Sequence, residues 1–395
     1  MKKTLLTICL VWMCFSLSAQ KIIDLSGKWS FSIDRQDNGE KEKWFSHTLN
    51  DFINLPGSMP EKLKGDEVTA KTQWTGSLYD SSYYYNPYME KYRKEGNIKF
   101  PFFLTPDKHY VGAAWYQKEV NIPADWKGER ILLFLERPHI ETTVWVNGQK
   151  TGMQNSLCVP HQYDITHYVR PGKCTITIRV DNRIKEINVG PDSHSITDQT
   201  QGNWNGIVGR ICLQTTPKTY FDDIQIYPEP EQKLARVKVV IKGTGTAKVK
   251  LSAESFNTDK KHIVPAIQQE IKLNKGVTET EMVLPMGNDM LLWDEFHPAL
   301  YKLKAEVTNG KKTEIKEIQF GMRRFEIKGK WFYVNGRKTQ LRGTVENCDF
   351  PLTGYAPMDV ESWERVFRIC RSYGLNHMRF HSFCPPEAAF MAADP

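Results

Sequence analysis

The 395-residue chain is 40% hydrophobic and 25% charged, which is the composition of a globular protein with two or three domains. Its formal net charge of +7 is mild for this length and forms no basic stripe or tail, which excludes nucleic acid as an expected partner. No apolar run is long enough to span a bilayer, so no membrane span is expected.

The first residues have the pattern of a targeting segment. Lys2 and Lys3 precede a short apolar run from Thr4 to Phe15, and small residues follow it up to Ala19. A basic start, an apolar stretch and small residues predict a secretory signal peptide over residues 1–19. We therefore expect an exported protein, periplasmic or extracellular.

Six cysteines follow this segment, and none belongs to a CxxC pair. They are Cys158, Cys174, Cys212, Cys348, Cys370 and Cys384. Their wide spacing indicates neither a zinc site nor a dense disulfide framework, so most are expected to be small buried hydrophobic residues. No metal and no cofactor are expected.

Residues 20–218 are predicted to form a β-sandwich of the jelly-roll type. Strand patterns with a period of two follow one another from Gly27, and Cys174, Ile176, Ile178 and Val180 share one face of a strand. Asn147-Gly148, directly after a strand pattern, predicts a tight hairpin because both turn positions need positive φ. Many antiparallel strands without a long helix are typical of this fold.

An aromatic-rich insertion interrupts the strands between residues 71 and 110. Its rings include Trp74, Tyr83, Tyr84, Tyr85, Tyr88, Phe102 and Phe103. Such rings stack on the apolar faces of sugars, so a carbohydrate subsite is one interpretation. The alternative is that they pack the insertion onto its own sandwich.

Residues 219–325 predict a second, immunoglobulin-like sandwich, since short strand patterns recur there without a stapling cysteine pair. The expected strands are Val237–Ile241, Ala247–Ala253, Gln269–Leu273, Thr278–Leu284, Leu300–Val307 and Glu314–Phe320. The domain is expected to act as a spacer.

Residues 326–395 change to a β-α-β-α pattern. After a hairpin at Trp331–Gly336, a strand is expected at Thr339–Arg342 and a helix capped by Asp359. A buried-looking strand, His377–Phe380, and a helix with Pro386 in its first turn follow. This pattern predicts the first two βα units of a TIM barrel, incomplete because such a barrel takes roughly 250 residues.

Nine segments, in the correct order, resemble glycoside hydrolase family 2, the β-galactosidase, β-glucuronidase and β-mannosidase group. They are Leu25–Trp29, Leu55–Ser58, Ala114–Tyr116, Val144–Gly148, Tyr163–Thr166, Trp204–Gly209, His297–Tyr301, Gly321–Arg323 and Leu341–Gly343. The resemblance implies a sugar-binding jelly roll, an immunoglobulin-like sandwich and a catalytic barrel. It also implies a retaining β-glycosidase, whose acid/base glutamate directly follows an Asn.

No Asn-Glu pair occurs after Asn335, so the acid/base and nucleophile glutamates are expected beyond the chain end, and this chain alone is predicted to be inactive. The resemblance places Arg342 at the carboxyl end of barrel strand one, with a structural salt bridge as the alternative. Arg379 and His381 match the family's Arg-x-His segment, in which the His contacts sugar hydroxyls; a structural role is the alternative for His381.

The chain departs from the family's Gly-x-Asn-x-His arrangement after Gly343, and Glu346 or Asn347 is expected to take over the contact of the missing His. Asp198 and Trp204 lie where jelly-roll residues of some relatives reach the substrate. For Asp198, stabilisation of a turn is the alternative.

The leading hypothesis is a catabolic glycoside hydrolase that takes an oligosaccharide or glycoside, with homo-oligomer formation left open. The rival hypothesis is a non-catalytic, lectin-like carbohydrate-binding protein. A purely structural β-sandwich module is the third, and the βα units speak against both alternatives.

Overall fold

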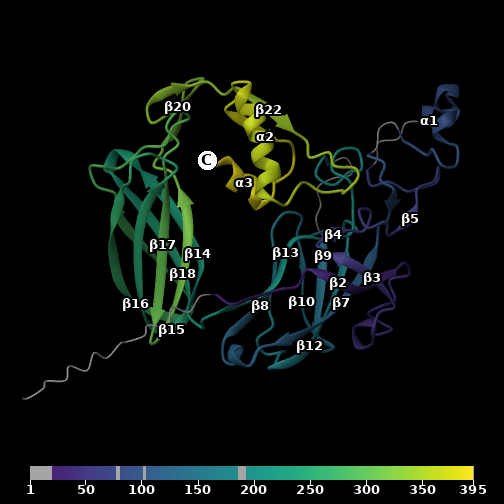
Figure 1. Ribbon diagram of the computed structural model, residues 1–395, viewed down its shortest axis with the longest axis horizontal. Coiled ribbons are helices and arrows are strands. Elements are labelled where there is room, and N and C mark those ends of the chain that lie inside the picture. The colour runs from purple at the N-terminus through teal and green to yellow at the C-terminus, as the bar shows by residue number, and fades with distance from the viewer. Residues whose placement is uncertain (1–19, 77–80, 101–103, 186–192, 395) are drawn as a thin grey trace, which may run out of the picture.

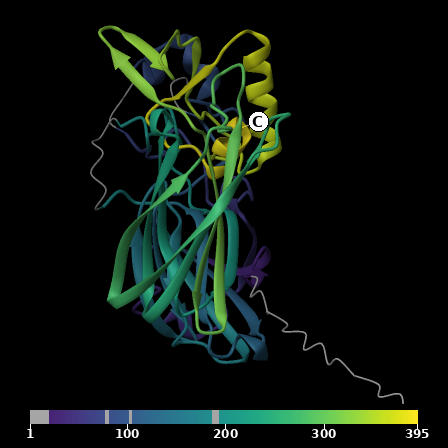
Figure 2. The same ribbon diagram turned by 90° about the vertical axis from the view of Figure 1, so that its left-hand side faces the viewer.

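The computed structural model describes residues 20–76, 81–100, 104–185 and 193–394, so the predicted signal peptide lies outside the described residues. Two β-sandwiches stand side by side, and a smaller region with two helices lies over one end of them (Figures 1 and 2). The chain is therefore mainly β and multidomain, as the sequence predicted. Among the described residues, no helix is long and apolar enough to cross a membrane.

The first sandwich has two main sheets. One has the strand order β1 (Ile22–Asp24), β13 (Gly206–Thr216), β8 (Arg130–Pro138) and β11 (His161–Asp164), with β4 (Gly57–Ser58) also paired to β13. The other has the order β10 (Gln149–Asn155), β9 (Glu141–Val146), β12 (Gly172–Asp181), β7 (Ala113–Ile122), β2 (Gly27–Asp34) and β3 (Asp51–Leu55). Single turns of 3-10 helix, η1 (Trp44–Ser46) and η3 (Ala124–Trp126), connect strands.

Alternation along the strands builds the core of this sandwich. Ile176, Ile178 and Val180 of β12 have no exposed surface, and β12 pairs with β7 on one side and β9 on the other. Each such side chain contributes about 1.5–3 kcal/mol when it leaves water. The predicted hairpin is confirmed between β9 and β10, where Asn147 and Gly148 have φ values of 50° and 77°.

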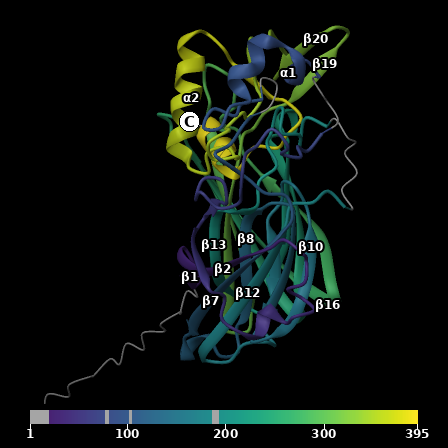
Figure 3. The same cartoon turned by 90° about the vertical axis from the view of Figure 1, so that its right-hand side faces the viewer.

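The aromatic insertion holds α1 (Ser82–Tyr85), η2 (Pro87–Tyr92) and β6 (Lys108–His109), which pairs with β5 (Asp66–Glu67) just before the insertion. Figure 3 labels α1. Tyr83 stacks on Phe100 with ring centroids 4.5 Å apart, and Trp74 meets Phe100 edge-on at 5.0 Å. These rings pack against one another within the insertion. Tyr85 and Tyr88 are 73% and 85% exposed and take no part in this packing. Phe102 and Phe103 lie outside the described residues.

The second sandwich is built around one long hairpin. Its elements are β14 (Tyr220–Glu229), η4 (Pro230–Gln232), β15 (Leu234–Phe256), β16 (Ile263–Pro285), β17 (Leu300–Asn309) and β18 (Lys312–Phe320). The expected strands Val237–Ile241 and Ala247–Ala253 are one strand, β15, and the two expected between 269 and 284 are both part of β16. The glycines between them do not end the pairing, because Gly243 and Gly245 absorb a register shift and bend the ladder.

The third region opens with a small sheet of β19 (Phe325–Lys328), β20 (Trp331–Val334) and β21 (Arg337–Thr339). A β-α-β unit follows, in which β22 (Gly343–Glu346) and β23 (His377–Phe380) are parallel and α2 (Val360–Ser372) connects them. The last element is α3 (Glu387–Ala393), with Pro386 at its N-cap. The Asp359 side chain accepts a hydrogen bond from the Ser362 amide at 2.8 Å, which confirms the predicted cap of α2.

Two details of this region were predicted wrongly. The strand expected at Thr339–Arg342 is displaced: β22 begins at Gly343, directly after Arg342, because Arg342 and Asn376 bond to each other just before the parallel pairing starts. The strand His377–Phe380 is half-exposed rather than buried. Phe380 packs on Trp363 of α2, whereas the opposite face of the strand has no covering layer among the described residues.

Candidate functional site

The carboxyl ends of β22 and β23 gather polar side chains at one edge. Glu346 is the last residue of β22, Asn347 follows it, and the His381 amide donates to the Glu346 carbonyl oxygen at 2.9 Å. Parallel strands present their carboxyl ends at the same edge, where sites in α/β structures form. Three of the predicted site residues are therefore brought together.

A loop of the first sandwich completes this edge. The Nδ1 atoms of His194 and His381 lie 3.2 Å apart, and their ring centroids are separated by 4.8 Å. The Ser195 hydroxyl donates to the Ser382 carbonyl oxygen at 2.6 Å. Two imidazoles from different domains thus face one another, and each ring has a second nitrogen that can donate to or accept from a hydroxyl.

Asp349 belongs to this edge, although the sequence did not predict it. Partial desolvation raises the pKa of its carboxyl, and the negative charge of Glu346 raises that pKa further. A hydrogen bond from Asn347 and the charge of His381 act in the opposite direction. The sequence signal that could have identified Asp349 is its position three residues after Glu346, in the connection between β22 and α2.

The backbone takes an unusual conformation just after each of the two parallel strands. Cys348 and Ser382, each two residues beyond the end of its strand, have φ values of 63° and 59°. Non-glycine residues in this region cost about 1–3 kcal/mol and persist where the surrounding structure holds them. Here, contacts with the first sandwich hold both turns.

The connection from β22 to α2 is fixed to the first sandwich by side chains. The Tyr355 hydroxyl donates to the Glu61 carboxylate at 2.9 Å, and Ser58 bonds to the Thr353 carbonyl oxygen. Gln201 bonds to the Asn347 carbonyl oxygen. The first sandwich therefore holds in place the residues at the carboxyl edge of β22 and β23, in addition to contributing its own loop with His194.

Trp204 also helps to hold the β22–α2 connection on the first sandwich. Its ring is only 5% exposed and stacks on His139 at 4.6 Å and against Tyr355 at 5.5 Å. A side chain covered on both faces cannot present a platform to a sugar. The geometry assigns Trp204 to support of the β22–α2 connection.

Asp198 stabilises its own loop. Its side chain is 2% exposed and accepts hydrogen bonds from the amides of Thr75 at 2.7 Å and Asn203 at 2.8 Å. The carboxylate is therefore occupied by backbone donors, which is the alternative that the sequence had left open.

The two arginines lie apart from this edge. Arg342 precedes β22, at its amino end, where it donates to the Gly374 carbonyl oxygen at 2.8 Å and lies 3.4 Å from Glu295 of the second sandwich. The prediction that it ends strand one is wrong, because the strand starts after it. Arg379 is on the exposed face of β23, opposite Val345 in the register.

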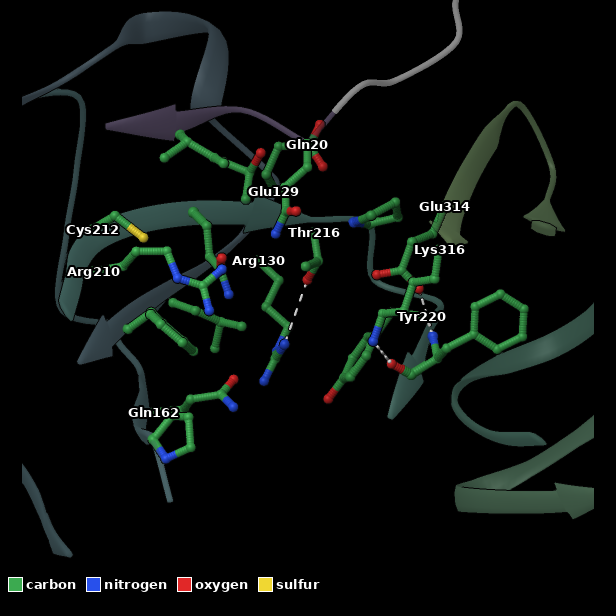
Figure 4. Close-up of a pocket in the computed structure, with 18 of the residues that line it drawn as sticks. Gln20, Glu129, Arg130, Gln162, Arg210, Cys212, Thr216, Tyr220, Glu314 and Lys316 are labelled. Atoms are coloured by element: carbon green, nitrogen blue, oxygen red, sulfur yellow. Dashed lines mark hydrogen bonds between the residues drawn. The ribbon is translucent and has the colours of Figure 1, made fainter. Parts of the chain in front are cut away.

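A cavity of about 1000 Å³ lies elsewhere, between the two sandwiches (Figure 4). Its polar groups are already paired: Arg130 donates to Asp164 at 2.8 Å, Glu314 accepts from the Phe221 amide at 2.6 Å, and Lys316 donates to the Phe221 carbonyl oxygen. Burial raises the pKa of Glu314. Each of these pairs lies within a single sandwich and leaves its groups occupied, so we do not assign chemistry to this cavity. Within the described ranges, no group of three or more His, Cys, Asp or Glu side chains could hold a metal ion.

Comparison with known families matches both sandwiches. Residues 22–217 match the description "Glycosyl hydrolases family 2, sugar binding domain", and residues 219–323 match "Glycosyl hydrolases family 2". The first sandwich thus matches the family's sugar-binding domain, and the second matches a further family 2 domain. The chain belongs to glycoside hydrolase family 2, as its nine segments predicted.

Curated relatives carry two kinds of activity name. A putative β-glucuronidase of Formosa agariphila is 27% identical over 298 residues, covering 74% of this chain and 34% of that protein. Human β-glucuronidase is 23% identical, with 94% of this chain and 55% of the relative covered. The β-galactosidase large subunit of Latilactobacillus sakei is 22% identical, with 94% and 58% covered. The chain thus spans between about a third and three-fifths of these relatives.

Solved structures show the same arrangement. The β-glucuronidase from Ruminococcus gnavus in complex with D-glucuronic acid superimposes with a TM-score of 0.68 at 19% identity, over 95% of this chain and 59% of that one. At this identity the likeness shows the fold alone.

Proposed function

We propose that this chain forms the sugar-binding and substrate-orienting part of an exported retaining β-glycosidase. In this proposal, residues 326–395 are the opening of the catalytic (β/α)₈ barrel, and β22 and β23 are its first two strands. The parallel pairing of these strands around α2 supports the assignment, as does the order of the two preceding sandwiches.

One observation carries the proposal: Glu346, Asn347, Asp349 and His381 meet at the carboxyl edge of the parallel pair, beside His194 of the sugar-binding sandwich. Carboxylate, amide and imidazole groups together donate to and accept from sugar hydroxyls. Active sites of (β/α)₈ enzymes lie at this end of the strands. The edge would orient a glycoside, with His381 in contact with its hydroxyls.

Hydrolysis requires more than this edge supplies. A retaining mechanism uses two carboxyl groups about 5–5.5 Å apart, one as nucleophile and one as acid/base. The family resemblance places the acid/base after an Asn, and residues 336–395 contain no Asn-Glu pair. We therefore propose that the chain alone binds glycosides weakly and does not hydrolyse them.

Release of 4-nitrophenol from 4-nitrophenyl β-glucuronide and β-galactoside tests the proposal that the chain alone does not hydrolyse glycosides. We expect no turnover above the rate without protein, because residues 336–395 contain no Asn-Glu pair that could supply the acid/base. Turnover that survives a further purification step would contradict it.

Saturation-transfer NMR with methyl β-glucuronide and methyl β-galactoside tests the proposal that the chain alone binds glycosides weakly. We expect binding with a Kd on the order of 1 mM, about −4 kcal/mol, which His381→Ala weakens at least several-fold. Leu352→Ala is the matched control, because Leu352 lies in the β22–α2 connection but is 72% exposed. Absence of transfer to either glycoside, or equal loss in both variants, would sink the assignment of this edge.

Exposed tyrosines favour a second candidate, a lectin-like role for the insertion. Tyr84, Tyr85 and Tyr88 are 45%, 73% and 85% exposed on one short segment. If the insertion is the binding surface, Tyr85→Ser combined with Tyr88→Ser removes the NMR signal while His381→Ala leaves it. The two candidates thus give opposite results in one experiment.

A further inference from the structure

Two cysteines from different domains lie beside one another. Cys158 is in the connection between β10 and β11 of the first sandwich, and Cys384 is in the connection between β23 and α3. The Nη2 atom of Arg137 lies 3.4 Å from the Cys158 carbonyl oxygen and 2.9 Å from that of Cys384. It also donates to the Pro385 carbonyl oxygen at 3.2 Å.

One guanidinium nitrogen therefore holds both backbones. Two carbonyl oxygens that share a single donor lie within two hydrogen-bond lengths of each other. A disulfide needs Cα atoms roughly 4.4–6.8 Å apart, and the shared donor brings the two backbone segments together at these two cysteines. The neighbouring thiol of Cys158 also contributes to the pKa of Cys384, which partial burial raises first. This agrees with sulfur atoms that are close in space.

Both sulfurs are reduced and within reach of a reagent. Cys384 is exposed and Cys158 is half-buried, whereas Cys174, Cys212 and Cys348 are buried. Cys370, on α2, is also half-buried. Among the residues that the structure describes, the accessible cysteines are thus this pair and Cys370, which serves as an internal control.

We propose that Cys158 and Cys384 are a disulfide-forming pair that links the third region covalently to the first sandwich. The oxidant is a small disulfide such as oxidised glutathione. The thiolate of one cysteine attacks it, forms a mixed disulfide and releases one glutathione thiol. The second cysteine, as thiolate, then attacks the mixed disulfide and releases the other. The protein loses two protons and two electrons, and the oxidant gains them.

The link would act close to the candidate site. His381 lies three residues before Cys384, and the segment between them includes Ser382, which already accepts a hydrogen bond from Ser195. A covalent bond at Cys384 would keep the β23–α3 connection on the sandwich, and with it the pairing of His381 and His194. Reduction leaves only the hydrogen bonds to hold that pairing.

Peptide mapping of the oxidised chain tests the proposal. The intact chain is treated with oxidised glutathione under native conditions, its remaining thiols are alkylated, and it is digested without reductant. We expect one cross-linked peptide joining Cys158 to Cys384, which dithiothreitol separates. Cys158→Ser should lose it and leave Cys384 alkylated or glutathionylated, whereas Cys370→Ser should retain it.

Several results would overturn the proposal. These are alkylation of both cysteines in the oxidised wild type, a link that appears only between two chains, or a link that forms only in urea. A second measurement does not depend on the variants folding well. Oxidised wild type should lose the segment after Arg379 to trypsin at least several-fold more slowly than the reduced protein, and equal rates would count against an interdomain link.

Discussion

The first sandwich and the β22–β23 pair use similar alternating strands but differ in what covers them. β12 has a hydrogen-bonded neighbour on each side, and its apolar residues have no exposed surface. β22 pairs only with β23 among the described strands, and its Val345 is 51% exposed. An alternating pattern therefore specifies a strand but not its stability, which comes from the neighbours.

The third region depends on contacts outside its own sheet. Tyr355 on Glu61, Ser382 on Ser195 and Arg137 on the Cys384 segment all connect it to the first sandwich. Its own buried cluster is small and centres on Trp363 and the alanines of α3. Regions with few buried contacts open locally at low free-energy cost, so we expect this region to open before the sandwich does.

Truncation inside each region should show the largest contrast. Leu213→Ala removes a side chain with no exposed surface from β13 and should cost about 2–5 kcal/mol of unfolding free energy. Val345→Ala, the matched change on the exposed face of β22, should cost about 0.5 kcal/mol or less. Urea unfolding followed by circular dichroism measures both. Similar losses in the two variants would break the comparison.

Acid should reveal a second property of the first sandwich. Burial opposes ionisation of Asp181, but hydrogen bonds from Arg183 and Lys185 outweigh it and lower the pKa of this carboxyl well below its usual range. The unfolded chain, with an ordinary pKa of about 3.9, then binds the proton first. The stabilisation is complete above that pKa and is lost as the pH falls below it toward the folded value.

Asp181→Asn should therefore destabilise the protein by about 1.5–3 kcal/mol near neutral pH, and the difference from wild type should shrink below about pH 4. Urea midpoints at a series of pH values test this. Asp289→Asn, at an exposed position, controls for loss of one negative charge. A difference that stays constant down to about pH 2 would exclude the linkage.

Removal of the α2 cap should give the most local effect. Asp359→Ala deletes the hydrogen bond to the Ser362 amide and should cost about 0.5–2 kcal/mol. Hydrogen exchange should accelerate in the amides of α2 and leave those of β12 unchanged. If β12 exchanges faster to the same extent, the third region does not open independently.

Much of this architecture could be predicted because local chemistry decides it. Asn147-Gly148 and Asn335-Gly336 specify their hairpins through positive φ, and Asp359 specifies the start of α2. The strands around Gly243 were predicted as separate because a glycine ends many strands. Here the ladder continues through a register shift, which only the partner strand determines.

The candidate site was less accessible to prediction because it depends on contacts distant in sequence. Glu346, Asn347 and His381 were predicted from the family resemblance, but their neighbour His194 comes from a loop of another domain. Trp204 and Asp198 have the residue types of a sugar site, and their burial gives them structural roles instead. Arg342 was misplaced by one strand boundary, which moved it to the opposite end of the pair.

The 23-residue strands β15 and β16 have a mechanical consequence for the second sandwich. The first half of β15 pairs with β14 and its second half with β17, while β16 pairs with β15 along both halves. Buried residues from both halves, such as Val239 and Leu251, enter one core. Because β15 and β16 connect the two halves, neither half can unfold without disrupting the strand pairing of the other. The domain should therefore unfold under force or heat in a single cooperative step.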